Sequence, residues 1–336
     1  MIRIALVGYG YWGPNLARCV ASSPVAKLTV IIEPSPDRSA AARESFPFVD
    51  IRSDFDEVLG DPTIDAVILA TPTPTHAELA CLAMAHGKHV LVEKPMADSS
   101  AAAMDMVEAS ERYERLLMVN HTYLFSPAFA IMCRLIVERE LGPVRYYHSN
   151  RSNCFGPGHE TSVLWDLAVH DLSMLDCLMP VSPTGVHTAG LRAADGQPAS
   201  HAQLTLTWPG LAMASVLVSW VAPAKVRQVT LGFDHHTIQW DDLAECGRVQ
   251  MFDRGLEPLV DPGNQRLARS VTEIIPVPTI EPLTRVIEHF TEQLVKGSVS
   301  SSYAATGLRI IRLLEAAERS MTGDGEYIEF QVAGAA

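Results

Sequence analysis

The stretch IRIALVGYGYWG, residues 2–13, decides the fold of this chain. It joins an apolar, partly β-branched run over residues 2–7 to glycines in the spacing G-x-G-x-x-G. Gly8 permits a tight turn, Gly10 lets the backbone approach a pyrophosphate, and Gly13 allows a helix to pack closely on the strand. The sequence therefore predicts that a strand, this turn and a helix form a dinucleotide site at the N-terminus.

The rest of the N-terminal part alternates between short apolar runs and helical patterns. The further strands that we expect are residues 27–32, 65–70, 89–93 and 116–120, and the two clearest helices are residues 75–86 and 99–112. Gly87 follows the first of these helices at the usual position for a stop. Alternating strands and helices predict βαβ units, so we expect residues 1–120 to form a doubly wound parallel sheet of the Rossmann type.

The remaining residues, 121–336, follow a different pattern. A helix is expected from Pro127 to about Glu140, and three stretches then alternate in the manner of half-exposed strands. These stretches are residues 144–151, 201–208 and 213–220, and they precede helical patterns at 283–296 and 303–321 and a last possible strand at 326–332. We therefore predict an α+β domain with a mostly antiparallel, open sheet, and an α/β protein as a whole.

Composition limits the functions that this chain can have. It contains 336 residues, 48% of them hydrophobic and 19% charged, with a formal net charge of −13. Binding the phosphate backbone of a nucleic acid needs a basic surface, so the negative net charge argues against a nucleic-acid partner. The first apolar stretch is broken by glycines too early for a signal peptide or a membrane span. We expect a soluble, cytoplasmic protein without a membrane partner.

The cysteines do not indicate a metal centre. The six cysteines have no CxxC spacing and no neighbouring histidine pair, which argues against a zinc site and against a disulfide framework. We expect reduced and mostly buried thiols, and no bound metal.

Glu33 points to the identity of the dinucleotide. It follows the second expected strand, twenty residues beyond Gly13. A carboxylate at this position accepts hydrogen bonds from the adenosine ribose and repels a 2′-phosphate, which favours NAD over NADP. Arg38 lies close by in the sequence and keeps NADP open as the alternative.

Four motifs in order carry a family resemblance. Glu93-Lys94-Pro95 stands at the carboxyl end of an expected parallel strand, where open α/β sheets bind ligands. Together with the glycine motif, Thr71-Pro72-Thr73 with His76, and the stretch WDLAVHD at residues 165–171, it resembles the Gfo/Idh/MocA family over nearly the whole chain. The resemblance implies an N-terminal Rossmann domain, a C-terminal domain whose open sheet builds homodimers or homotetramers, and a substrate pocket between the two domains.

The resemblance places Lys94, Asp166 and His170 at catalytic positions, and the chemistry of a dehydrogenase suits these residue types. An alcohol that gives up a hydride must also lose a proton, and a neutral imidazole such as His170 is matched to accept it. Asp166 precedes His170 by one helical turn, so it could orient the imidazole or bind a neighbouring hydroxyl. Lys94 would stabilise negative charge on the reacting oxygen.

The motifs also assign binding residues. The cofactor residues that we expect are Gly8, Gly10, Tyr11, Trp12, Gly13, Glu33, Thr71, Pro72, Thr73, His76, Glu93 and Lys94. The substrate residues that we expect are His121, Tyr123, Arg151, Asn153, Glu160 and Trp165. Polar side chains of this kind suit the hydroxyls of a sugar ring.

The substrate is less closely defined by the sequence. The chain is similar to the subgroup that oxidises the 3-hydroxyl of sugar nucleotides, but residues 154–162 hold Glu160 and lack the arginines usual there. This acid and the net charge suggest an amino sugar or aminoglycoside, oxidised at C3 in antibiotic biosynthesis. A UDP-sugar 3-dehydrogenase, a keto-sugar reductase and a non-catalytic, dinucleotide-sensing regulator remain as alternatives.

Overall fold

The computed structural model describes residues 1–154, 161–192, 194, 196–209, 212–246, 248–256 and 273–330. The chain divides into two compact units. The first unit consists of Met1–Phe125 and Ile280–Arg312, and the second consists of Ser126–Thr279 and Leu313–Ala336. Each unit has its own sheet.

A parallel sheet of six strands in the order β3-β2-β1-β4-β5-β6 forms the centre of the first unit. Its strands are β1 (Ile2–Val7), β2 (Ala26–Ile32), β3 (Asp50–Arg52), β4 (Ala66–Leu69), β5 (His89–Val92) and β6 (Leu117–Val119). The predicted doubly wound parallel sheet is confirmed. The edge strand β3 was not predicted, because its three residues include only one apolar side chain, Ile51.

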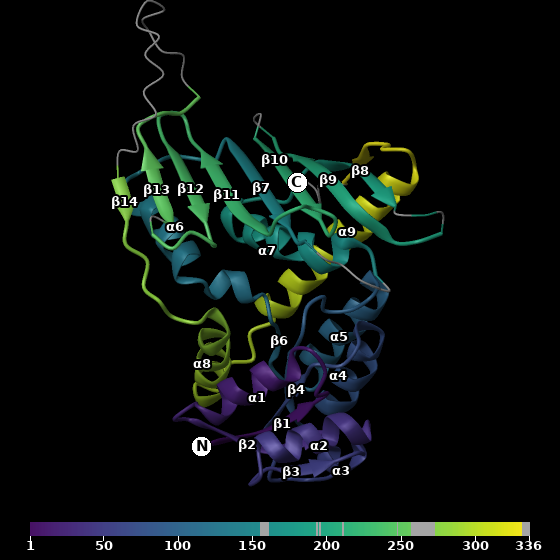
Figure 1. The fold of residues 1–336 in the computed structure, drawn as a ribbon. Helices are drawn as coiled ribbons and strands as arrows, with labels where there is room; N and C mark the ends of the chain where they lie inside the picture. The colour runs from purple at the N-terminus through teal and green to yellow at the C-terminus, as the bar shows by residue number, and fades with distance from the viewer. Residues whose placement is uncertain are drawn as a thin grey trace, which may run out of the picture. The chain divides into compact units, whose positions relative to one another are not determined.

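Helices cover the first unit's sheet on both sides. They are α1 (Gly13–Ala21), α2 (Pro36–Ser45), α3 (Asp56–Leu59), α4 (His76–Ala85), α5 (Ser100–Arg112) and α8 (Pro282–Val295), and α9 (Ser302–Thr322) begins in this unit. The helix α1 packs with α8, and α4 packs with α5 (Figure 1). Gly87 follows α4 with a φ of 77°, as a glycine stop requires.

The helix α8 belongs to the first unit although it lies far along the sequence. Leu283, Val286, Ile287 and Phe290 recur at helical spacing and are at most 4% exposed. They share one hydrophobic core with residues of β1 and α1. The first unit therefore extends beyond the predicted boundary at residue 120, because burying this apolar stripe brings residues 280–312 back to the Rossmann sheet.

The second unit is built on a sheet of nine strands in the order β14-β13-β12-β11-β7-β10-β9-β8-β15. The strands are β7 (Tyr146–Ser152), β8 (Gly185–Arg192), β9 (Ala199–Thr207), β10 (Met213–Ser219), β11 (Val226–Gly232), β12 (Thr237–Asp241), β13 (Val249–Phe252), β14 (Glu273–Ile275) and β15 (Ile328–Glu329). Within the described part, β7 and β10 pair in parallel and the other neighbours are antiparallel. The mostly antiparallel sheet is thus confirmed.

Helices α6 (Pro127–Glu138) and α7 (Val169–Leu178) lie against one face of this sheet (Figure 1). A π-helical turn, Leu164–Ala168, leads directly into α7. Among the residues that the structure describes, none of the helices combines the length and apolarity that crossing a lipid bilayer requires.

All six cysteines carry free thiols. Only Cys19 is buried, whereas Cys177 and Cys246 are exposed. The prediction of mostly buried thiols is therefore wrong. The helical cysteines such as Cys133 and Cys177 lie on the flanks of their helices, while neighbouring apolar residues fill the core-facing positions.

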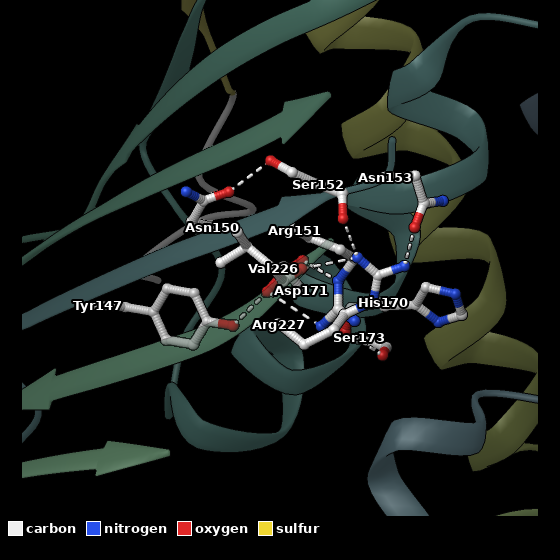
Figure 2. A network of polar contacts seen from close by, with 10 residues as sticks. All are labelled: Tyr147, Asn150, Arg151, Ser152, Asn153, His170, Asp171, Ser173, Val226 and Arg227. Atoms are coloured by element: carbon white, nitrogen blue, oxygen red, sulfur yellow. Dashed lines mark hydrogen bonds and ion pairs between the residues drawn. The ribbon is translucent and has the colours of Figure 1, made fainter. Parts of the chain in front are cut away.

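A buried ion pair fastens α7 to the central strand β7 (Figure 2). The Arg151 Nε atom lies 2.8 Å from the Asp171 Oδ2 atom, and the Tyr147 hydroxyl donates to Asp171 Oδ1 at 2.7 Å. All three side chains are at most 3% exposed. Burial, then the charge of Asp171, raises the pKa of Tyr147 well above its ordinary value, so the hydroxyl remains protonated and able to donate.

We expect Asp171→Asn to lower the free energy of unfolding by about 3–5 kcal/mol, because the buried guanidinium of Arg151 loses the anion that it contacts. Urea titration followed by circular dichroism measures this change. The matched control is Glu281→Gln, which removes the exposed Arg18–Glu281 pair and should cost about 1 kcal/mol or less. Equal costs for the two variants would contradict a structural role for the buried pair.

Candidate cofactor and catalytic site

A cavity of about 370 Å³ opens at the carboxyl ends of the strands of the first unit. Most of the residues that line it lie in the segments that follow β1, β2, β4 and β5. Eleven predicted cofactor residues line the cavity, namely Gly8, Gly10, Tyr11, Trp12, Glu33, Thr71, Pro72, Thr73, His76, Glu93 and Lys94. The structure therefore brings together the residues that the motifs single out, as the switch point of a doubly wound sheet would. Their contact with a cofactor stays a prediction.

The glycine turn fits a pyrophosphate. Gly8 has a φ of 95°, and a Cβ there would lie 2.6 Å from the Ala70 carbonyl oxygen. A Cβ on Gly13, the first residue of α1, would lie 2.6 Å from the Gly8 carbonyl oxygen. At Gly10, by contrast, a Cβ would have nothing within 4 Å among the described residues, so this backbone borders open space. Backbone amides at such a helix N-terminus suit an anion.

Glu33 is held as an anion at the edge of the cavity. It is 2% exposed, and its carboxylate accepts hydrogen bonds from the Tyr9 and Ser35 backbone N–H groups at 2.8 and 2.9 Å. Arg38 donates from Nη2 to Oε1 at 2.9 Å. Burial raises the pKa of Glu33, but the hydrogen bonds from Arg38, Ser35 and Tyr9 outweigh burial and lower the pKa overall.

Hydrogen bonds also hold the loops that follow β4 and β5. The imidazole of His76 lies between two carbonyl oxygens, with Nδ1 at 3.0 Å from Pro95 O and Nε2 at 2.9 Å from Thr71 O. Burial lowers the pKa of His76, while the two carbonyl contacts raise it less. The Lys94–Pro95 peptide is cis. His76 thus connects the threonine loop to the segment that carries Lys94.

The acid next to Lys94 is buried as well. The Glu93 carboxylate accepts a hydrogen bond from Asn120 Nδ2 at 2.6 Å and one from the Lys94 backbone N–H at 3.2 Å. Burial raises the pKa of Glu93, and the contacts with Asn120 and Lys94 oppose this rise. The pairing of Asn120 with Glu93 depends on β5 and β6 lying side by side.

Asp166 and His170 lie together in the second unit, at the start of α7. Asp166 stands in the π-helical turn and His170 in the first turn of α7, and both side chains are partly exposed. Trp220 Nε1 donates to Asp166 Oδ2 at 3.1 Å. Ser173 Oγ donates to the His170 carbonyl oxygen at 2.7 Å. Single π-helical turns occur often at functional sites, and this one lies at the residues that the motif marks.

The predicted substrate residues are distributed over both units. His121 is buried and Tyr123 partly exposed in the first unit, whereas Arg151, Asn153 and the partly exposed Trp165 belong to the second. Glu160 lies outside the described residues. These substrate roles stay predictions.

Arg227 is a further residue near the end of β7. Its Nη2 donates to Asn153 Oδ1 at 2.7 Å, and its Nη1 donates to the carbonyl oxygens of Ser152 and Val226 (Figure 2). Sequence reasoning missed Arg227, as it missed Trp220. Its position follows from the register of β11 on β7, which places Arg227 opposite Arg151 and which the sequence alone does not show. No group of three or more histidine, cysteine, aspartate or glutamate residues within the described ranges is placed to hold a metal ion.

Two family models match this chain. The model described as "Oxidoreductase family, NAD-binding Rossmann fold" matches residues 2–121, and that described as "GFO/IDH/MocA C-terminal domain" matches residues 129–238.

Among the curated relatives with an assigned activity, one matches about half of the chain at 31% identity and another matches nearly all of it at 24% identity. The scyllo-inositol 2-dehydrogenase (NAD(+)) of Bacillus subtilis (strain 168) is 31% identical over 56% of this chain and 57% of its own length. The inositol 2-dehydrogenase of Streptomyces avermitilis is 24% identical over 98% of this chain and 95% of its own length. The chain matches only 58% of the length of each of the first two curated relatives.

Solved structures agree over nearly the whole chain. A putative oxidoreductase from Magnetospirillum magnetotacticum MS-1 has a TM-score of 0.80 and 29% identity, covering 94% of this chain and 99% of its own. UDP-N-acetylglucosamine 3-dehydrogenase from Acidithiobacillus ferrooxidans, at 21% identity and a TM-score of 0.82, covers 96% and 98% and shares the fold. The chain, with its NAD-binding Rossmann domain and its matching C-terminal domain, belongs to the Gfo/Idh/MocA family of oxidoreductases.

Proposed function

We propose that this protein is an NAD-dependent dehydrogenase that oxidises a secondary hydroxyl on the ring of a sugar or cyclitol. The observation that carries the proposal is the cavity in which the glycine turn, the anionic Glu33 and Lys94 occur together. The inositol dehydrogenases among the relatives support the reaction class.

The chain's own residues would hold the cofactor in three places. The amides at the start of α1 would bind the pyrophosphate, and the Glu33 carboxylate would accept hydrogen bonds from the adenosine ribose. Thr71, Thr73 and Lys94 would border the part of the cofactor that lies nearest the substrate. A nicotinamide held by these residues would supply the hydride acceptor for the oxidation.

In the proposed mechanism, Lys94 donates a hydrogen bond to the reacting oxygen and stabilises its developing negative charge. His170 accepts the hydroxyl proton. Asp166, whose carboxylate is held by Trp220, orients the imidazole or binds an adjacent hydroxyl. The same groups would serve a keto-sugar reductase in the opposite direction, because the proton transfer is reversible.

We extend the proposal to an amino sugar or aminoglycoside, oxidised at C3 in antibiotic biosynthesis. The support is the net charge of −13, which attracts a cationic substrate. A UDP-sugar remains the alternative substrate. A homodimer or homotetramer in the cytoplasm is part of the same proposal.

The first test replaces the general base. We expect His170→Ala to lower kcat about 10²–10⁴-fold, because the proton acceptor is lost, while NAD⁺ binding is retained. NADH absorbance is followed with NAD⁺ and inositols, free sugars, UDP-sugars and aminoglycosides. The matched control is His148→Ala, which removes an exposed histidine of β7 and should keep full activity. Undiminished turnover in His170→Ala would refute the assigned role, and a wild type that binds NAD⁺ without any turnover would favour a dinucleotide sensor.

The second test concerns the choice of dinucleotide. We expect Glu33→Gln to shift the ratio of NADP⁺ to NAD⁺ affinity by about tenfold, or about 1.4 kcal/mol, towards NADP⁺. The substitution removes the charge that repels a 2′-phosphate and releases Arg38 to bind it. Isothermal titration calorimetry with both dinucleotides measures the ratio. Glu44→Gln, on the exposed side of α2, serves as the control, and an unchanged ratio in Glu33→Gln would exclude Glu33 as the discriminating residue.

The third test addresses the cationic substrate. If the substrate is an amino sugar, its N-acetylated, neutral counterpart should show a kcat/KM at least about tenfold lower at low salt. The preference should decrease as ionic strength rises, because salt screens the attraction. Equal kcat/KM values for the two sugars, or turnover of UDP-sugars alone, would contradict the amino-sugar substrate and favour the UDP-sugar alternative.

A further inference from the structure

The buried imidazole of His76 contacts two hydrogen-bond acceptors at once. His76 is the first residue of α4 and is 1% exposed. Its Nδ1 atom lies 3.0 Å from the Pro95 carbonyl oxygen, and its Nε2 atom lies 2.9 Å from the Thr71 carbonyl oxygen. A carbonyl oxygen only accepts hydrogen bonds, so both contacts are hydrogen bonds only when both ring nitrogens carry a proton. The geometry is thus that of an imidazolium.

A neutral imidazole satisfies only one of the two carbonyls, because only one of its nitrogens carries a proton. Pro95 is buried, whereas Thr71 is partly exposed. A buried acceptor without a partner costs more free energy than an acceptor that water can reach. The single proton of the neutral ring therefore belongs on Nδ1, which donates to Pro95. The neutral ring then holds the segment that carries Lys94 but not the threonine loop, Thr71–Thr73.

In the protein alone, the surroundings of His76 favour the neutral ring. Burial lowers the pKa of His76, and the nearby backbone carbonyls raise it less. His76 also stands at the N-terminus of α4, where the positive end of the helix dipole disfavours a cation. Near neutral pH, the contact with Thr71 is therefore the one that lacks its proton.

The charged groups around His76 show what would change this balance. Asp98, in the segment after Pro95, favours the imidazolium, and on α5, which packs against α4, Asp105 acts on Cys81. The charged side chains that line the cavity together with His76 are Glu33, Arg38, Glu93 and Lys94. These are two acids and two bases, so the diphosphate of a bound dinucleotide would add net negative charge. An anion close to an imidazole favours its protonated form.

We propose that His76 takes up a proton from solvent when the dinucleotide binds, and that the imidazolium then acts as a positioning residue for the two loops that border the cofactor. The inference rests on the cofactor site of the proposed function, since Thr71, His76 and Lys94 line one cavity. The new proton is on Nε2 and is donated to the Thr71 carbonyl. The threonine loop and the segment that carries Lys94 are then held by the same ring.

Proton binding and dinucleotide binding are coupled in this scheme. A ligand that raises the proton affinity of His76 binds more tightly where the proton is available. The pKa of His76 lies below its ordinary value in the free protein and is higher in the complex, so proton uptake is largest between these two values. We expect the Kd for NAD⁺ to rise about five- to tenfold as pH increases through this interval.

Isothermal titration calorimetry of the full-length protein with NAD⁺ tests the inference. Titrations at about pH 6.5, in phosphate and in imidazole buffer, give the number of protons taken up, because the two buffers differ in ionisation enthalpy. We expect the wild type to take up a fraction of one proton per NAD⁺. His76→Gln, which cannot be protonated, should take up none and should lose the pH dependence of Kd. The matched control is His86→Gln, at the exposed end of α4, which should behave as the wild type.

Nitrogen-15 NMR of the wild type provides a measurement that needs no variant. With the His76 signals assigned through the backbone, we expect one protonated ring nitrogen, Nδ1, in the free protein at neutral pH, and a larger protonated fraction of Nε2 after NAD⁺ is added. A wild type that does not bind NAD⁺ would contradict the proposed function and this inference together. Binding without proton uptake, uptake that persists in His76→Gln, or an Nε2 whose protonation does not change with NAD⁺ would overturn this inference alone.

Discussion

The close approach of the Gly8 backbone to Ala70 is the constraint on which the first unit depends. Any side chain at Gly8 would meet the Ala70 carbonyl, and any side chain at Gly13 would meet Gly8 itself. Because these backbones meet without intervening side chains, β1 turns directly into α1, and the helix N-terminus faces the cavity. The space for a pyrophosphate is thus a consequence of backbone packing.

Buried acids give this cavity its polar character, and each is stabilised in a different way. Glu33 receives three hydrogen bonds that keep its pKa low, so it presents a fixed negative charge at one end. Glu93 is buried beside Lys94, and burial raises its pKa despite the amide of Asn120. In a low-dielectric surrounding, burial raises the free energy of a charged carboxylate, and each hydrogen bond to that carboxylate is stronger than it would be in water.

Hydrogen bonds and an ion pair also hold the buried polar groups of the second unit. Arg151 and Tyr147 project from one face of β7 towards Asp171, and the ion pair fixes the helix that bears His170. Arg227, on the neighbouring strand, holds Asn153 at the strand end.

The sequence by itself determined what local patterns can encode. The glycine spacing, the alternation of strands and helices and the position of Glu33 predicted the Rossmann sheet and most of the residues that line the cavity, because strand ends and turns are set by neighbours in the chain. The short edge strand β3 was not predicted, because three residues are too few to show an alternation of apolar and polar side chains.

Tertiary structure decided the contacts between distant segments. Only folding brings α8 to the core of β1 and pairs Arg151 with Asp171. None of these partners has a fixed sequence spacing, because each contact depends on how helices pack on a sheet and on strand register. Periodicity within one element shows which face is buried but does not name the residue that the face will meet.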